Sequence, residues 1–129
     1  MKNVISTLIV EDNEFLRKSF SEIVKMYIPN IRIRGAADGK EAFKRIEESL
    51  PDIIFMDVQL PGTSGLELTK EIKERYAKVI VCVFTNYDIP EYREAARNSG
   101  ADCYLIKDTL TGSDIARLIT ILYQAAHGL

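Results

Sequence analysis

Short apolar runs alternate along this chain with longer segments in which apolar residues recur at helical spacing. The short runs are rich in β-branched residues and have few polar interruptions, as strands buried on both faces of a parallel sheet do. One run alternates apolar and basic residues, which is typical of an edge strand. We expect five strands, at residues 7–10, 31–34 (the alternating one), 53–56, 79–84 and 103–106.

A helical segment follows each of these strands. We expect helices over residues 13–27, 38–46, 66–72, 88–99 and 113–127. Asp38 followed by Glu41 resembles a capping box at the start of the second helix. Asp88 and Pro90 are the expected cap and first-turn residues of the fourth helix, and Gly100 marks its end.

Five strands, each followed by a helix, predict an α/β fold. We expect a flavodoxin-like, doubly wound sheet of five parallel strands in the order 2-1-3-4-5, with about five helices. The chain has 129 residues, the length of one ordinary domain, and no low-complexity linker interrupts it. The sequence therefore predicts a single domain over residues 1–129.

Composition narrows the classes of partner. The formal net charge is -2, with 47% hydrophobic and 28% charged residues, so we expect no direct nucleic-acid binding by this chain. The first apolar run ends abruptly at Glu11, so it lacks the length and flanks of a signal peptide or membrane span. We expect a cytoplasmic protein with no membrane contact.

We expect Cys82 and Cys103 to be reduced thiols in the core, because no CxxC motif or Cys/His cluster surrounds them.

Polar residues stand at the carboxyl ends of four expected strands: Glu11 and Asp12, then Asp57, Thr85 and Lys107. Ligands of open α/β sheets bind outside these ends, at the switch point between the first and third strands in this order. Three carboxylates brought together raise one another's pKa unless a cation is present, which favours Mg²⁺. Asp57 can attack phosphorus as a nucleophile, and Lys107 can balance the phosphoryl charge. Each of these residues, taken alone, is also explained as a helix cap, a strand-end hydroxyl or a solvated surface charge. Their joint position at one edge of the sheet favours a functional site.

The motifs at these strand ends occur together, in order, in a known family. They are LIVED at 8–12, PDIIFMD at 51–57, PG at 61–62, SG at 64–65, Thr85 after a buried strand, and GADCYLIK at 100–107. Over nearly its whole length, the chain resembles the receiver domains of two-component response regulators. The resemblance implies a switch that accepts a phosphoryl group from a sensor histidine kinase in the presence of Mg²⁺.

The resemblance also implies a role for each site residue. Asp57 is the implied phosphoacceptor, with Asp12 and the backbone carbonyl of Gln59 as further metal ligands. Glu11 is the implied carboxylate that acts largely through metal-bound water.

Three further residues carry implied roles in signal transmission. Thr85 and Lys107 contact the phosphoryl group, and Tyr104 is the aromatic residue whose rotamer reports the switch, although a half-buried strand tyrosine is the ordinary alternative.

The expected output surface is the face of the fourth helix, fifth strand and fifth helix, where a partner or a second copy of the chain could bind. Its expected exposed residues are Tyr92, Arg93, Arg97 and Arg117.

Within the family, the chain is most similar to receivers that precede a LuxR-type helix-turn-helix. The similarity lies in NIRI at 30–33, TNYD at 85–88 and Lys107-Asp108. It implies transcription regulation through a separate or removed output domain.

Residues beside the expected phosphoryl pocket depart from the family pattern. Many receivers have alanine or glycine where this chain has Asn86, and Gln59 and Tyr87 border the same pocket. These three residues are therefore expected to modulate the lifetime of the phosphoryl group.

Three alternative functions stay open at this point. A flavin or nucleotide module needs a phosphate loop rich in Gly, Ser or Thr, where this chain has Glu-Asp-Asn-Glu at 11–14. A metal-dependent phosphatase with an aspartyl nucleophile would place that nucleophile in an Asp-x-Asp pair after the first strand, and this pair is absent here. A phosphorylation-independent interaction domain would not need the complete acidic set.

Overall fold

The computed structural model describes residues 4–128, in which strands and helices alternate. The strands are β1 (Ser6–Val10), β2 (Arg32–Ala36), β3 (Ile53–Asp57), β4 (Ile80–Thr85) and β5 (Cys103–Ile106). The helices are α1 (Glu14–Tyr27), α2 (Gly39–Glu48), α3 (Gly65–Arg75), α4 (Pro90–Asn98) and α5 (Gly112–Ala126), with a short 3-10 helix, η1 (Lys107–Thr109), before α5. The expected order of strands and helices is confirmed.

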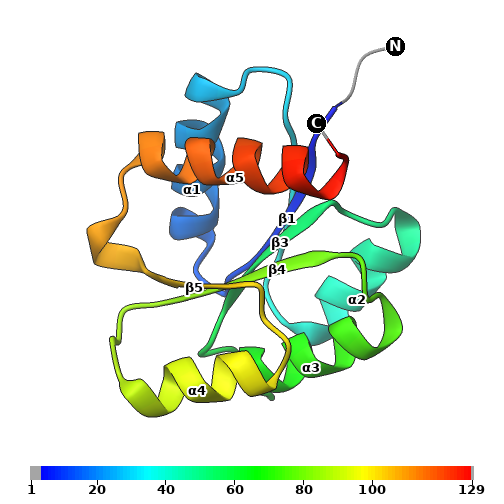
Figure 1. Cartoon of the computed structure of the whole chain (residues 1–129), viewed down its shortest axis with the longest axis vertical. Coiled ribbons are helices and arrows are strands. Elements are labelled where there is room, and N and C mark those ends of the chain that lie inside the picture. Colours follow the sequence, from blue (N-terminus) through cyan, green and yellow to red (C-terminus); the bar gives the residue numbers. More distant parts are fainter. Residues whose placement is uncertain (1–3, 129) are drawn as a thin grey trace.

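Neighbouring strands pair in parallel in the order β2-β1-β3-β4-β5, so the predicted flavodoxin-like topology is confirmed. Helices α1 and α5 cover one face of the sheet, whereas α2, α3 and α4 cover the other (Figure 1). The order places β1 beside β3, and it places β2 at one edge, as its alternating pattern predicts. Across residues 4–128, no helix combines the length and apolarity that crossing a membrane requires.

The central strands β1 and β3 are largely apolar because helices cover both faces of the sheet. In β1, Leu8 and Val10 pack in the core on the side of α2, α3 and α4, while Ile9 packs on the side of α1 and α5. All five residues of β3 are buried. Asp57, the last residue of β3, is therefore positioned by a fully enclosed strand.

The start of α4 differs from the prediction. Ile89 is the N-cap residue and makes no side-chain cap hydrogen bond, and Pro90 is the first helical residue as expected. Asp88 instead accepts a hydrogen bond from Arg93 Nε at 2.8 Å. The prediction of Asp88 as the helix cap is therefore wrong, because its carboxylate binds a side chain of the helix rather than a backbone N–H. Gly100 ends the α4 segment with a positive φ of 90°, as expected.

The two cysteines lie side by side in neighbouring strands. Cys82 of β4 is in register with Cys103 of β5. Cys82 is buried, whereas Cys103 is half-buried because β5 is an edge strand. The expectation of a core position therefore holds fully for Cys82 only.

Candidate functional site

Three carboxylates meet where β1 and β3 end. Glu11 follows β1 directly and Asp57 ends β3, and these two residues are only 2% and 6% exposed. Asp12 is exposed. One carboxylate oxygen from each of the three residues lies within 4.8 Å of the other two. The structure thus brings these three predicted residues together at one edge of the sheet.

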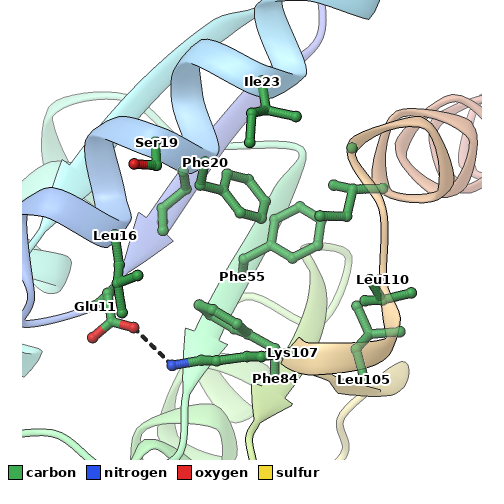
Figure 2. A pocket seen from close by; sticks show the side chains of 13 residues that line it. Glu11, Leu16, Ser19, Phe20, Ile23, Phe55, Phe84, Leu105, Lys107 and Leu110 are labelled. Atoms are coloured by element: carbon green, nitrogen blue, oxygen red, sulfur yellow. Dashed lines mark hydrogen bonds and ion pairs between the residues drawn. The ribbon is translucent and has the colours of Figure 1, made fainter.

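Lys107 connects two of these carboxylates from the end of β5. Its Nζ lies 2.8 Å from Glu11 Oε1 and 3.4 Å from Asp57 Oδ2. Figure 2 shows the Lys107 side chain reaching Glu11. Lys107 begins η1, which the sequence analysis does not predict. The predicted lysine is therefore in the site, and its shorter contact is with Glu11 rather than with Asp57.

An apolar cavity of about 240 Å³ lies beside Lys107 and Glu11 (Figure 2). Phe20, Phe55 and Phe84 line it, with ring centroids 4.9–6.4 Å apart. The centre of the Phe84 ring lies 4.7 Å from Lys107 Nζ, within cation–π range. Phe84 is a site residue that the sequence analysis misses, because nothing in the sequence distinguishes it from the other apolar residues of β4.

The site carries more negative than positive charge. A hydrogen bond shared with Glu11 raises the pKa of the Asp12 carboxyl, and desolvation and the negative charge of Glu11 raise it further. Such a shift marks a carboxyl group that lies beside other negative charge. The oxygen donors of the three carboxylates fit a hard divalent cation such as Mg²⁺, which Glu11, Asp12 and Asp57 could hold.

The loop from β3 to α3 is packed tightly against Asp57. The backbone N–H of Gln59 donates to Asp57 Oδ1 at 3.3 Å, and the N–H of Gly65 donates to the carbonyl of Val58 at 2.8 Å. A Cβ added to Gly65 would lie only 1.8 Å from the Asp57 carbonyl oxygen. Gly65 is thus a second residue that the sequence analysis does not assign to the site, although it belongs to the Ser64-Gly65 motif. The metal-binding role of the Gln59 carbonyl stays a prediction.

Thr85 and Tyr104 are linked through the loop that follows β4. Thr85 ends β4 and is buried, and its Oγ1 accepts a hydrogen bond from the Tyr87 N–H at 3.3 Å. The Tyr104 hydroxyl donates to the Tyr87 carbonyl at 2.7 Å. Asn86 and Tyr87 are exposed at the surface of this loop. The two predicted switch residues therefore both bond to one residue between them.

Three of the four residues expected to be exposed on the output surface are exposed, and the role of this surface stays a prediction. Arg93, Arg97 and Arg117 are exposed on α4 and α5. Tyr92, expected to be exposed, is half-buried instead, with its ring 6.4 Å from that of Tyr87 in an edge-on arrangement. The prediction for Tyr92 is wrong because this aromatic contact covers part of its ring.

The family model of the response regulator receiver domain matches residues 7–120. The nitrate/nitrite response regulator protein NarL of Escherichia coli (strain K12) is 33% identical over 122 residues, which cover 94% of this chain and 54% of NarL. The chain spans about half the length of the curated relatives it matches.

Solved structures give the same fold. A DNA-binding response regulator of the LuxR family from Staphylococcus aureus superimposes with a TM-score of 0.83 at 27% identity, covering 93% of this chain and 99% of that one. A CheY-like receiver domain protein from Methanospirillum hungatei JF-1 superimposes with a TM-score of 0.89 at 22% identity, covering 98% of both chains. The resemblance to the LuxR branch is thereby confirmed, as is the fold class.

Proposed function

The chain belongs to the response regulator receiver domain family, and from this premise we propose that it is a phosphorylation switch whose phosphoacceptor is Asp57. A sensor histidine kinase is the proposed donor. An output domain of the LuxR type, on the same or a separate chain, is the proposed target, and a second copy of the chain is a further proposed partner. The domain catalyses only its own phosphorylation and dephosphorylation.

One observation carries this proposal: Lys107 Nζ contacts both Glu11 and Asp57, and one oxygen from each of Glu11, Asp12 and Asp57 lies within 4.8 Å of the other two. A phosphoryl group on Asp57 needs cationic neutralisation on more than one side. Lys107 supplies one cation, and the acidic set fits a second, divalent one. A structural salt bridge alone would not require a third carboxylate beside the pair.

In the proposed transfer, a carboxylate oxygen of Asp57 forms a bond to phosphorus while the P–N bond of the donor phosphohistidine breaks. The departing imidazole nitrogen keeps the electron pair of that bond. Bound Mg²⁺ would neutralise charge that develops on the phosphoryl oxygens. Lys107 would orient the incoming group, and the buried position of Asp57 would limit the access of water to the product.

The proposed signal leaves the site through Thr85 and Tyr104. A phosphoryl oxygen is a stronger acceptor for the Thr85 hydroxyl than any neutral group, so the hydroxyl would turn toward it. The backbone of Tyr87, which contacts both residues, would then shift with it. Gln59, Asn86 and Tyr87 are exposed in the loops that follow Asp57 and Thr85, and we propose that they modulate the phosphoryl lifetime.

Intact mass spectrometry after incubation with acetyl phosphate and Mg²⁺ tests the proposal. We expect one phosphoryl adduct per chain that is labile to hydroxylamine, as an acyl phosphate is. The control is Asp57→Asn, which keeps the side-chain shape but cannot attack phosphorus, and it should show no adduct while retaining the wild-type circular dichroism spectrum. A stoichiometric adduct in Asp57→Asn would overturn the assignment, and catalytic turnover of phosphomonoesters would favour a phosphatase instead.

A further inference from the structure

The apolar cavity of about 240 Å³ lies between helix α1 and the segment from β5 to α5, on the face of the sheet that α1 and α5 cover. Phe55 of β3 and Phe84 of β4 form its floor. Phe20 and Ile23 of α1 form one wall, and Leu110, before α5, lies on the other side (Figure 2). The cavity therefore presents rings and aliphatic groups to a molecule that enters it.

The charged groups at the edge of the cavity are already paired. Glu11 Oε1 lies 2.8 Å from Lys107 Nζ, and Glu11 Oε2 accepts a hydrogen bond from the Asn13 N–H at 3.2 Å. Lys107 Nζ also lies 3.4 Å from Asp57 Oδ2 and 4.7 Å from the centre of the Phe84 ring. An ordered water in a cavity needs about two to four polar partners, and groups engaged in this way offer few. Water in the cavity is therefore readily displaced by an apolar molecule.

The volume of the cavity sets the size of the molecule that fits. An apolar cavity of about 150 Å³ lined by leucine, isoleucine and phenylalanine accepts benzene, and pockets for drug-sized ligands measure roughly 300–1,000 Å³. At about 240 Å³, this cavity lies between these sizes. It fits one small molecule of one or two rings.

The lining and the charges favour a neutral aromatic molecule over an ion. The rings of Phe20, Phe55 and Phe84 have centroids 4.9–6.4 Å apart in tilted or edge-on arrangements, and a further ring can pack against them in the same way. A ligand carboxylate would lie beside three carboxylates whose ammonium partner is already paired. A ligand cation would find the place beside Glu11 and over the Phe84 ring taken by Lys107. Either ion would also lose its hydration on entering apolar surroundings.

From these observations we propose that the cavity is a binding site for one small, neutral aromatic molecule, which packs against the three phenylalanine rings and the side chain of Lys107. This site goes beyond the proposed function of Asp57, and neither proposal depends on the other. A molecule bound here covers one side of Lys107, the residue that contacts both buried carboxylates. Such a molecule is thereby in direct contact with the acidic site.

Titration of the full chain with toluene and with indole, followed by NMR, tests the proposal. We expect both probes to bind with a dissociation constant on the order of 1 mM or below, in keeping with the few non-hydrogen atoms that each buries. Benzoate and benzylammonium carry the ring of toluene with a negative or a positive charge. Each should bind at least about tenfold more weakly than toluene, because its charge loses hydration in the cavity. Nuclear Overhauser contacts should connect the protons of indole to the rings of Phe20, Phe55 and Phe84.

Variants in the α1 wall test the position of the site. Ser19 lies in this wall, and Ser19→Leu should weaken indole binding at least about tenfold, because a closely packed interior leaves no room for a ring. Ser19→Ala removes only the hydroxyl and should bind indole as the wild type does. The matched control is Lys25→Leu, which places the same side chain on the exposed surface of α1 and should leave the affinity unchanged. Leu16→Trp adds a larger side chain to the same wall and gives the same test if Ser19→Leu does not fold.

Three results would overturn the proposal: no saturable binding of either neutral probe, equal affinities for toluene and benzoate, or wild-type affinity for indole in both Ser19→Leu and Leu16→Trp. A dimer that Ser19→Leu weakens, in a protein that does not bind indole, would also overturn it, because a side chain of a second copy would then fill the cavity. The labelling of Asp57 by acetyl phosphate is measured separately and without these probes. Failure of the cavity proposal is therefore distinguishable from failure of the phosphorylation switch.

Discussion

Glu11 and Asp57 are carboxylates that the fold encloses, and Lys107 contacts both of them. A buried charge is costly unless it is paired, so folding and the chemistry of the site depend on the same ammonium group. Before phosphorylation, the shorter contact of 2.8 Å makes Glu11 the main partner of Lys107. In the proposed phosphorylated state, a phosphoryl group on Asp57 would compete with Glu11 for this cation.

Replacing Lys107 by alanine tests this pairing. We expect Lys107→Ala to lower the free energy of unfolding by about 1–3 kcal/mol, because Glu11 stays buried without its partner. Adding Glu11→Gln should recover most of the loss, since it removes the unpaired charge. Chemical denaturation of the wild type, both single variants and the double variant gives the coupling energy. Strictly additive losses would contradict the pairing.

The phosphorylated Lys107→Ala protein should still bind Mg²⁺ but should lose much of the conformational response.

Asp12 connects the protonation of the site to metal binding. Its carboxyl has a raised pKa, chiefly because of the hydrogen bond shared with Glu11, and only a deprotonated carboxylate binds a metal. Asp12 therefore takes up a proton at a higher pH than an ordinary aspartate, and Mg²⁺ affinity should fall as the pH falls through this raised value. Asp12→Asn should bind Mg²⁺ more weakly at neutral pH but lose less affinity on acidification. Calorimetric titrations across mildly acidic pH measure both, and equal pH dependence in the two proteins would exclude Asp12 as the titrating ligand.

Helix α5 begins in close contact with α1, and this contact anchors the segment that starts at Lys107. Thr111 and Asp114 form a reciprocal capping box at the start of α5. Between them, Gly112 approaches α1 so closely that an added Cβ would lie 2.0 Å from Ile23 Cγ2. The position of α5, and with it the loop after β5, therefore depends on the absence of a side chain at residue 112.

Gly112→Ala tests this dependence. We expect the extra methyl group to lower the free energy of unfolding by about 1–3 kcal/mol, because the helices must move apart. Ile23→Ala, which removes the obstructing methyl group, should restore much of the loss in the double variant. Ile23 is 42% exposed, so Ile23→Ala alone should cost little. Thermal or chemical denaturation measures all three variants, and no recovery in the double variant would show that the strain arises elsewhere.

Strands and helices could be predicted from the sequence because hydrophobic periodicity reports which faces are buried. The strand expected at 31–34 runs over Arg32–Ala36 instead, since pairing with β1 extends through Gly35 and Ala36, whose small side chains give no hydrophobic signal. The sequence alone wrongly predicts Asp88 as the cap of α4. An aspartate two residues before a proline favours a cap, whether its carboxylate accepts from a backbone N–H or from a neighbouring arginine. Competition between a side chain and a backbone group for one carboxylate leaves no periodic pattern in the sequence.

At the scale of the whole molecule, the position of the site was predictable and its internal contacts were not. The parallel order brings the ends of β1, β3, β4 and β5 to one edge, so polar residues at those ends must gather there. Which carboxylate Lys107 contacts more closely depends on side-chain directions across two strands. The contact of Arg93 with Tyr104 joins α4 to β5 across the surface, a pairing that no local pattern reports.

The same geometry makes a prediction for the molecule as a whole. Tyr104 packs against the core on the side of α2, α3 and α4, and its hydroxyl is bonded to the loop that follows Thr85. Beryllofluoride with Mg²⁺ should therefore cause amide chemical-shift changes that extend from Asp57 through Thr85 and Tyr104 to the exposed face of α4, β5 and α5. Thr85→Ala removes the hydroxyl that we propose responds to the phosphoryl mimic, so the distant changes should largely disappear while those beside Asp57 stay. Changes confined to the Asp57 pocket in the wild type would show that the signal does not follow this route, since a partner can be switched only by a surface that differs between the two states.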